Sequence, residues 1–443
     1  MSVDPLVNCI RRLRPDRTVF LCSEGSKVHV ETIRSQVPVG QFDPERDVVV
    51  LKQNTKARSG RDGEPTANDL DRLDQVYLTA RELISRIRRD DPTASIAVDY
   101  TGGTKTMATG LALAAIDDGR VELLLTTADR RPKGELAIQG HSTPVPVDVA
   151  LVHTRRLLDG ELPPLLARHD YAAAQQAITR VRRLSLPAAI IASLHRAETL
   201  VMAFDYWDRC DHRQSLILLA EYAADPQVKQ AFFLPLKRVL GSRQLVDLPQ
   251  SPQEEPEYEA RGRLAIQGHG LEAIEDLLLN AERRAQQDRY DDAVGRLYRA
   301  LELTAQLLLV LDHDGIRTAD VDLALLPPSL QDRYAAKRTE RQGKLRLQLA
   351  LHDSFELLAE LGHPVGLQWR ERKSALIDAL QVRNNSLFAH GFRPVTYTDW
   401  LQLDAVIGGF LRSVVEQRRG NQAPVQQFPN TLALLGTDDR DSG

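Results

Sequence analysis

At 443 residues, with 42% hydrophobic and 27% charged residues, the chain has room for about three domains and the composition of a soluble globular protein. Its formal net charge of −4 at pH 7 excludes a general affinity of the whole surface for nucleic acid, although a local basic groove is compatible with that total. The three cysteines, Cys9, Cys22 and Cys210, form no CxxC pair, which excludes a disulfide framework and a cysteine zinc site and is typical of a reducing cytoplasm.

The first 155 residues alternate short β-branched runs with helical stretches. They begin with a charged amphipathic segment that lacks the apolar core of a secretion signal. Apolar periodicity predicts helices over 69–89 and 106–116. Strand–helix alternation predicts a mainly parallel, Rossmann-like sheet with helices on both faces, and such sheets bind ligands outside the carboxyl ends of their strands. The predicted strands are TVFLC (18–22), DVVVLKQ (47–53), ASIAVDY (94–100), VELLLTT (121–127) and PVDVALV (146–152).

After residue 155 the strand signals stop, so the predicted fold is an α/β N-terminal domain followed by an all-α remainder. We predict four parts: an α/β sensor domain over 1–155, a helical linker region over 156–262, an all-α domain over 263–418 and a poorly ordered tail over 419–443. The longest apolar run, Leu307 to Leu311, is too short to cross a bilayer. We therefore expect a cytoplasmic protein with no membrane partner.

The segment AVDYTGGTKTMATGLALAA (97–115) places a strand, a polar loop and a helix start in succession. Two glycines allow the backbone positive φ values, and the unpaired N–H groups of the helix start favour phosphate. Threonine, not glycine, precedes Lys105, so the P-loop motif is absent and hydrolysis of ATP or GTP is not expected. We interpret the loop as an anion site, with a simple tight turn as the alternative. Its candidate residues are Thr101, Gly102, Gly103, Thr104, Lys105 and Thr106.

Two further polar loops are predicted to leave the same edge of the sheet. Ser23-Glu24-Gly25-Ser26-Lys27 follows the first predicted strand, and Gln53-Asn54-Thr55-Lys56 follows the second. Each loop alone has the composition of a solvated turn. A site is indicated only because all of the loops are predicted to leave the same edge of the sheet. The candidate residues of the first loop are Ser23, Gly25 and Ser26.

The segment SALIDALQVRNNSLFAHGF (374–392) predicts a helix whose apolar face carries two ionisable groups. Asn384 within that helix is a poor helix former, which indicates a requirement other than stability. Gly391 is placed to end the helix just after the histidine. The residues that share the stripe are Leu376, Leu380, Arg383, Leu387 and His390.

This pair of ionisable groups suits cleavage of RNA without a metal. The ribose 2′-OH attacks the neighbouring phosphorus, a histidine transfers or orients a proton, and an arginine holds the phosphate. Arg383 and His390 lie about 10.5 Å apart along one ideal helix, so we expect them to share a site only where two copies pack around a two-fold axis. The alternative is a helix-end histidine and a salt-bridged core arginine.

The segment RNNSLFAHG (383–391) resembles the R-x4–6-H signature of HEPN ribonucleases, with six intervening residues. DYTGGTKTM, after a strand, resembles the effector loop of CARF domains. In this order, over 17–155 and 265–415, the chain resembles the CARF–HEPN ribonucleases of type III CRISPR systems. YDDAVGRLYRALELTAQ (290–306) resembles the first HEPN helix, in which the polar candidates are Arg296, Arg299 and Glu302.

The resemblance implies a homodimer that binds cyclic tetra-adenylate or cyclic hexa-adenylate at Ser23–Ser26 and Thr101–Thr106. It implies a metal-independent endoribonuclease without cofactor, which cleaves single-stranded RNA in antiviral defence through Arg383, Asn384 and His390. No stable association with the CRISPR effector complex is expected. The alternative is a ligand-sensing dimeric regulator whose HEPN-like domain is catalytically inactive.

Overall fold

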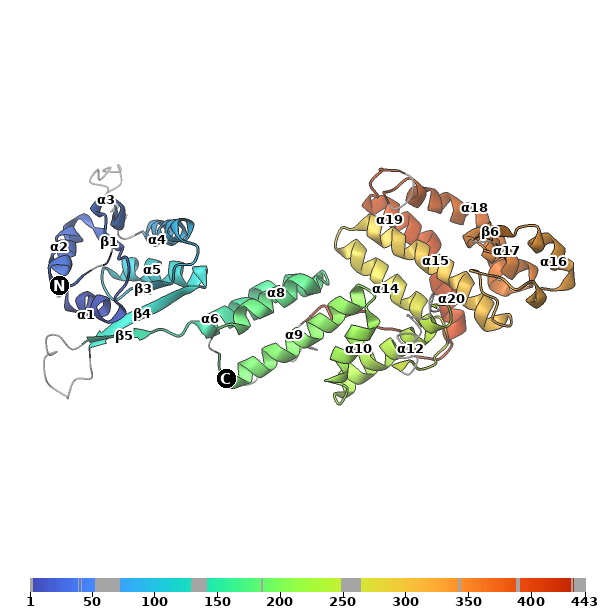
Figure 1. The fold of residues 1–443 in the computed structure, drawn as a ribbon, viewed down its shortest axis with the longest axis horizontal. Helices are drawn as coiled ribbons and strands as arrows, with labels where there is room; N and C mark the ends of the chain where they lie inside the picture. Colours follow the sequence, from blue (N-terminus) through green and yellow to red (C-terminus); the bar gives the residue numbers. More distant parts are fainter. Residues whose placement is uncertain are drawn as a thin grey trace, which may run out of the picture. The chain divides into compact units, whose positions relative to one another are not determined.

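The chain forms two compact units, Met1–Thr154 and Arg155–Gly443, which Figure 1 follows along the sequence. The computed structural model describes residues 3–38, 40, 42–51, 72–128, 142–184, 186–247, 264–341, 344–387, 391–431 and 433. Within these ranges, no helix combines the length and the apolar character needed to span a bilayer.

The N-terminal unit is an α/β fold in which two pairs of strands are parallel. β1 (Phe20–Ser23) pairs with β2 (Val48–Leu51), and β3 (Ile96–Asp99) pairs with β4 (Val121–Ala128). The helices predicted over 69–89 and 106–116 are confirmed as α4 and α5 over their described residues. The helices of the unit are α1 (Asp4–Leu13), the 3₁₀ turn η1 (Glu24–Ser26), α2 (Lys27–Gln36), α3 (Pro44–Asp47), α4 (Leu73–Asp90) and α5 (Lys105–Asp118).

Successive residues of β1 show how helices cover the sheet. Phe20 packs into an apolar cluster with α1 and α2, whereas Leu21 packs into another with α4 and α5. Because neighbouring side chains of a strand point to opposite faces, helices cover both faces of the sheet, as predicted.

The last predicted strand, 146–152, is wrong. The strand β5 spans Ser142–Pro146 and runs antiparallel to β4, so the β3-β4-β5 sheet is mixed, whereas β1 and β2 form a parallel pair. The helix α6 (Ala150–Arg155) begins four residues after the strand, where the Asp148 carboxylate accepts a hydrogen bond from the Ala150 N–H (2.9 Å). A short apolar run has no periodicity that distinguishes a strand from a helix, and here the capping aspartate decides.

The second unit opens with a group of helices built around one apolar cluster. Phe204 and Trp207, both fully buried in α9, lie at its centre. The elements are the π-helical turn η3 (Arg156–Glu161), α7 (Leu162–Ala167), α8 (Tyr171–Arg182), α9 (Ala188–Asp208), α10 (His212–Ala220), α11 (Pro226–Val228), the π-helical turn η4 (Lys229–Phe233) and α12 (Leu234–Gln244).

The remaining helices of the second unit share another apolar cluster, in which the rings of Phe355 and Trp369 stack with centroids 4.3 Å apart. The hairpin of α14 and α15 packs beside α17 and α18 (Figure 1). The elements are α14 (Glu272–Gln286), α15 (Tyr290–Asp312), the 3₁₀ turn η5 (Leu323–Leu325), α16 (Pro328–Ala335), β6 (Thr339–Arg341), β7 (Lys344–Arg346), α17 (Leu351–Glu360), α18 (Pro364–Asn384), α19 (Tyr397–Leu403), the π-helical turn η6 (Asp404–Gly408) and α20 (Gly409–Arg419).

The prediction of a purely α-helical C-terminal region is therefore wrong in one place. β6 and β7 form a small antiparallel hairpin. The two strands flank the dipeptide Gln342-Gly343, and a two-residue connection that contains glycine favours a hairpin.

The tail predicted as poorly ordered over 419–443 is ordered through Pro429. Val425 and Phe428 are buried among the helices that surround Trp207. The hydroxyl of Tyr171, in α8, donates to the Pro429 carbonyl (2.6 Å). The prediction rested on the position of the segment at the end of the chain, and it missed that two apolar residues bury surface among the helices.

Candidate functional site

The glycine–threonine loop connects the end of β3 to the start of α5. Gly103 has φ +91°, a conformation that favours glycine, and the Thr104 side chain caps α5 by accepting from the Met107 N–H (3.2 Å). Gly103, Thr104 and Lys105 are exposed. The loop thus presents a helix N-terminus and a lysine to solvent, which is an arrangement that attracts anions.

Beneath this loop, the Asp99 carboxylate holds the backbone in place. It accepts hydrogen bonds from the Thr101 N–H (2.9 Å), from the Thr101 hydroxyl and from the Thr126 hydroxyl (2.7 Å). The Thr126 N–H donates to the Thr101 hydroxyl oxygen (2.6 Å). Burial, together with the neighbouring Asp99, raises the pKa of the Cys9 thiol to about 12. Asp99 therefore holds the loop in position. The Thr101 hydroxyl forms hydrogen bonds inside the protein, to Asp99 and Thr126.

The second predicted loop follows β1 directly. The Ser23 side chain accepts from the Ser26 N–H (3.2 Å), and their hydroxyl oxygens lie 2.8 Å apart. Leu21 and Val98, each just before the end of its strand, pack into the same apolar cluster. Gly25 is exposed, and a side chain there would meet nothing within 4 Å. The role of both loops in binding stays a prediction, and the third loop, Gln53 to Lys56, lies outside the described residues.

The helix that carries Arg383 ends earlier than predicted. α18 ends at Asn384, so the predicted helix does not continue to Leu387, which lies in a turn and is 65% exposed. The side chains of Asn and Ser compete with the helix for backbone hydrogen bonds, and the Ser386 hydroxyl donates to the Arg383 carbonyl (2.8 Å).

Beyond the helix, the chain turns back on itself. The Gly391 N–H donates to the Ser386 carbonyl (3.2 Å), and the Arg393 N–H donates to the Asn385 carbonyl (3.1 Å). A Cβ at Gly391 would lie 2.2 Å from the Asn385 carbonyl oxygen. Glycine is therefore required for close approach of two backbone segments, not to end a helix as predicted. His390 itself lies outside the described residues.

Arg383 is held by an aromatic ring. Its guanidinium carbon lies 4.1 Å from the centroid of the Tyr298 ring, on α15. Nη1 donates to Asn384 Oδ1 (3.4 Å), and Nε is buried without a hydrogen-bond partner. Among the described residues, no carboxylate lies within ion-pair distance of Arg383. The alternative of a salt-bridged core arginine therefore finds no support here, and the guanidinium keeps donors for an anion.

The other polar candidates of α15 differ in their contacts. Arg296 donates to Asp292 (2.9 Å) on its own helix and to Asn280 Oδ1 (3.0 Å) on α14, so it joins the two helices. Arg299 lies 3.6 Å from Glu302, and Glu302 is the hydrogen-bond partner of the Tyr298 hydroxyl. Tyr298 was absent from the sequence-based candidates. Its i, i+4 spacing to the candidate Glu302 is the sequence signal that would have found it.

Large apolar side chains are exposed around the turn that follows α18. Phe392 is 89% exposed, and Leu387, Tyr397 and Leu401 are exposed as well. An apolar patch of this kind on a folded domain is typical of a surface that binds another protein.

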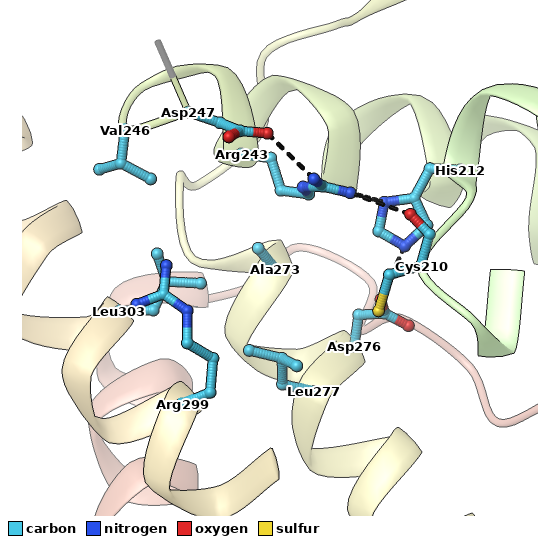
Figure 2. A pocket seen from close by; sticks show the side chains of 10 residues that line it. All are labelled: Cys210, His212, Arg243, Val246, Asp247, Ala273, Asp276, Leu277, Arg299 and Leu303. Carbon is cyan, nitrogen blue, oxygen red and sulfur yellow. Dashed lines mark hydrogen bonds and ion pairs between the residues drawn. The ribbon is translucent and has the colours of Figure 1, made fainter. Parts of the chain in front are cut away.

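A cavity of about 210 Å³ lies elsewhere in the same unit, between α10, α12, α14 and α15 (Figure 2). Several of its polar groups contact one another: Arg243 lies 3.0 Å from His212 Nδ1 and 2.9 Å from Asp247, and His212 Nε2 lies 3.2 Å from Asp276. Charges paired in this way leave no evident reactive group. Within the described ranges, no group of three or more His, Cys, Asp or Glu side chains is arranged to hold a metal ion.

Comparison with known proteins agrees with this geometry. Residues 264–413, which include Arg383 and Tyr298, match the family model described as the Csm6 HEPN domain. A solved structure, the Csm6 of Enterococcus italicus bound to cyclic hexa-2'-fluoro-hexa-dAMP, matches with a TM-score of 0.51 and 12% identity, over 93% of this chain and 89% of that chain. No curated protein matches.

The match to the Csm6 HEPN model covers residues 264–413, and the likeness to the solved structure shows a shared fold over most of the chain.

Proposed function

We propose that the chain is an endoribonuclease of type III CRISPR antiviral defence that cyclic oligoadenylate activates. The observation that carries this proposal is the state of Arg383. Inside a Csm6-type HEPN domain, its guanidinium is held by a ring and leaves donors open to a phosphate. An arginine kept only for stability is normally paired with a carboxylate when it is partly buried.

The proposed reaction is an attack of the ribose 2′-OH on the adjacent phosphorus. The bond from the 2′ oxygen to phosphorus forms, the bond from phosphorus to the 5′ oxygen breaks, and the 2′ proton is removed as the leaving oxygen gains one. His390 takes part in the proton transfer, Arg383 stabilises the charge on the phosphoryl oxygens, and Asn384 orients Arg383 through its Oδ1. All of the atoms come from RNA and side chains, so the proposal requires no metal.

Two copies of the chain supply one composite site in this proposal. The exposed apolar side chains Leu387, Phe392, Tyr397 and Leu401 surround the turn after Arg383, and a two-fold contact through them covers this patch. The two Arg383 side chains then face one cleft that accepts single-stranded RNA.

The N-terminal unit is the proposed sensor. The loops at Ser23–Ser26 and Thr101–Thr106 offer a helix N-terminus, hydroxyl groups and Lys105 to a ring of phosphates. The Enterococcus italicus relative is bound to a six-unit cyclic analogue, which favours cyclic hexa-adenylate over cyclic tetra-adenylate as the activator of this chain.

The test uses the purified full-length chain with labelled single-stranded RNA in EDTA, with and without cyclic adenylates of three to six units. We expect cleavage only when the matching cyclic adenylate is present, and no cleavage of DNA, which lacks the 2′-OH. Tight binding of the activator without cleavage would instead support a dimeric regulator with an inactive HEPN-like domain. Cleavage that is independent of every cyclic adenylate would contradict the sensor role.

Replacing Lys105 with alanine is expected to raise the activator concentration for half-maximal cleavage by about tenfold or more. A charge-assisted hydrogen bond to phosphate contributes about 1.5–3 kcal/mol, and the exposed lysine at the start of α5 is placed to make one. The measurement is an activation curve at saturating RNA, with the exposed Lys229 changed to alanine as the control. Equal activation curves for both variants would remove Lys105 from the site.

Replacing Gly391 with alanine is expected to lower cleavage by about a hundredfold, because displacement of catalytic groups by about 1 Å has costs of that order. A Cβ there would lie 2.2 Å from the Asn385 carbonyl oxygen, so the backbone beside the end of α18 must move. Gly409→Ala is the control, since a Cβ at that helical glycine meets nothing within 4 Å. Full activity of Gly391→Ala would show that the geometry of this turn is not needed for cleavage.

A further inference from the structure

The contact between Tyr298 and Arg383 joins two helices that lie far apart in the sequence. Tyr298 projects from α15, and Arg383 from the last turn of α18. The guanidinium carbon lies 4.1 Å from the ring centroid, well within the range of a cation–π contact. Both side chains are half-buried, so water screens the contact less than at an open surface.

Arginines nearby are held in a different way. Arg393, on the same turn, donates to the Asp399 carboxylate (3.1 Å). Arg370, on α18 itself, donates to Glu356 (2.9 Å). A carboxylate occupies the N–H groups of an arginine and offsets its charge, whereas the face of a ring restrains the guanidinium plane and leaves the N–H groups at its edge free.

We propose that Tyr298 is a positioning residue of the HEPN site, whose ring holds the Arg383 guanidinium with its N–H edge open to the scissile phosphate. This inference rests on the proposed ribonuclease function and names a further residue of the same site. Tyr298 acts through Arg383 and touches no reacting atom.

Glu302 orients the ring. It lies one helical turn after Tyr298 and accepts a hydrogen bond from the tyrosine hydroxyl, while Arg299 lies 3.6 Å from the same carboxylate. Burial raises the pKa of Tyr298, and the bond to Glu302 raises it further, so the hydroxyl stays protonated as a donor. The nearby Arg299 offsets the negative charge of Glu302, which would otherwise repel a phosphate bound at Arg383.

The experiment compares Tyr298→Leu with Tyr298→Phe in the full-length protein at saturating activator. Loss of the ring is expected to lower kcat by about tenfold, the size of a partly desolvated cation–π contact, with a smaller change in KM. Tyr298→Phe keeps the ring and should retain kcat within about twofold. Tyr206→Leu is the matched control, because it removes a similar contact, from the Arg209 guanidinium at 5.0 Å, on α9.

A second measurement does not depend on activity. In ¹⁵N-labelled protein, the Nε–H resonance of Arg383 should be shifted by the ring current of Tyr298, and Arg383→Lys assigns it. The shift should persist in Tyr298→Phe and vanish in Tyr298→Leu.

The two measurements separate this inference from the function it rests on. Equal kcat for Tyr298→Leu and the unaltered protein would overturn the positioning role while leaving the ribonuclease function intact. Loss of kcat in Tyr298→Phe equal to that in Tyr298→Leu would also overturn it, since the hydroxyl and not the ring would then matter. If the unaltered protein cleaves no RNA, the proposed function fails, and a ring-current shift that is unchanged in Tyr298→Leu would refute the contact itself.

Discussion

Arg383→Ala and His390→Ala are each expected to lower activated RNA cleavage by about 10²- to 10⁴-fold, the range found when a general acid–base group or a charge-stabilising donor is removed. Arg383 keeps a buried Nε without partner and has no carboxylate beside it within the described part of the chain. Its loss therefore removes donors that the transition state uses, with little change to the packing of α18. The measurement is the single-turnover rate of labelled RNA at saturating activator.

Binding of the activator supplies an internal control. Both variants should bind cyclic adenylate as the unaltered protein does, because the residues concerned belong to the other compact unit. Arg372→Ala, an exposed arginine on the same helix, should cleave normally. The double variant should be no slower than the worse single variant, since groups that act as a unit are not additive. Full cleavage by His390→Ala would refute the assignment of the site.

The second large effect concerns stability. Asp208, at the end of α9, accepts from Arg283 Nε (2.8 Å), from Arg284 and from Asn280 Nδ2 (3.1 Å), all on α14. Asp208 and both arginines are buried. Asp208→Ala leaves two buried cations without their carboxylate, and we expect it to lower the free energy of unfolding by about 3–5 kcal/mol. Urea unfolding followed by tryptophan fluorescence measures this change, because Trp207 is buried one residue away.

A neighbouring aspartate on the same helix is the matched control. Asp205 pairs with Arg209 one turn later, and the arginine is exposed, so Asp205→Ala should cost no more than about 0.5 kcal/mol. Asp208→Asn keeps one acceptor oxygen and should fall between the two. If Asp208→Ala were as mild as Asp205→Ala, the two buried arginines would have to find other partners.

The C-terminal segment also contacts Arg283, one of the two arginines that Asp208 binds. Gln427 Oε1 accepts from Arg283 Nη1 (2.6 Å), and the Phe428 ring lies 3.7 Å from the Arg283 guanidinium carbon. The segment thus joins α14 to the group of helices around Trp207. The effect of Asp208→Ala therefore reports on the contact between these helices and α14.

The sequence by itself determined the features that depend on neighbouring residues. The passage from β3 through the loop into α5 was predictable because a strand, two glycines and a capping threonine stand in one short segment. The prediction of Arg383 as a site residue rests on a short signature within 383–391, which is also a local feature. The helices α4 and α5 followed from apolar periodicity, which is also a local property.

Tertiary structure alone decided the details that give these residues their chemistry. α18 ends at Asn384 because side chains and a returning backbone outcompete the next helical turn, and Gly391 is needed because Asn385 lies against it. The Tyr298 ring meets Arg383 only because α15 packs beside α18. The strand expected over 146–152 is replaced by the end of β5 at Pro146 and by a helix that begins at Ala150, where Asp148 caps it. Some of these contacts join residues that are distant in the sequence, and others decide between local conformations of similar energy. The periodicity of apolar residues predicts neither.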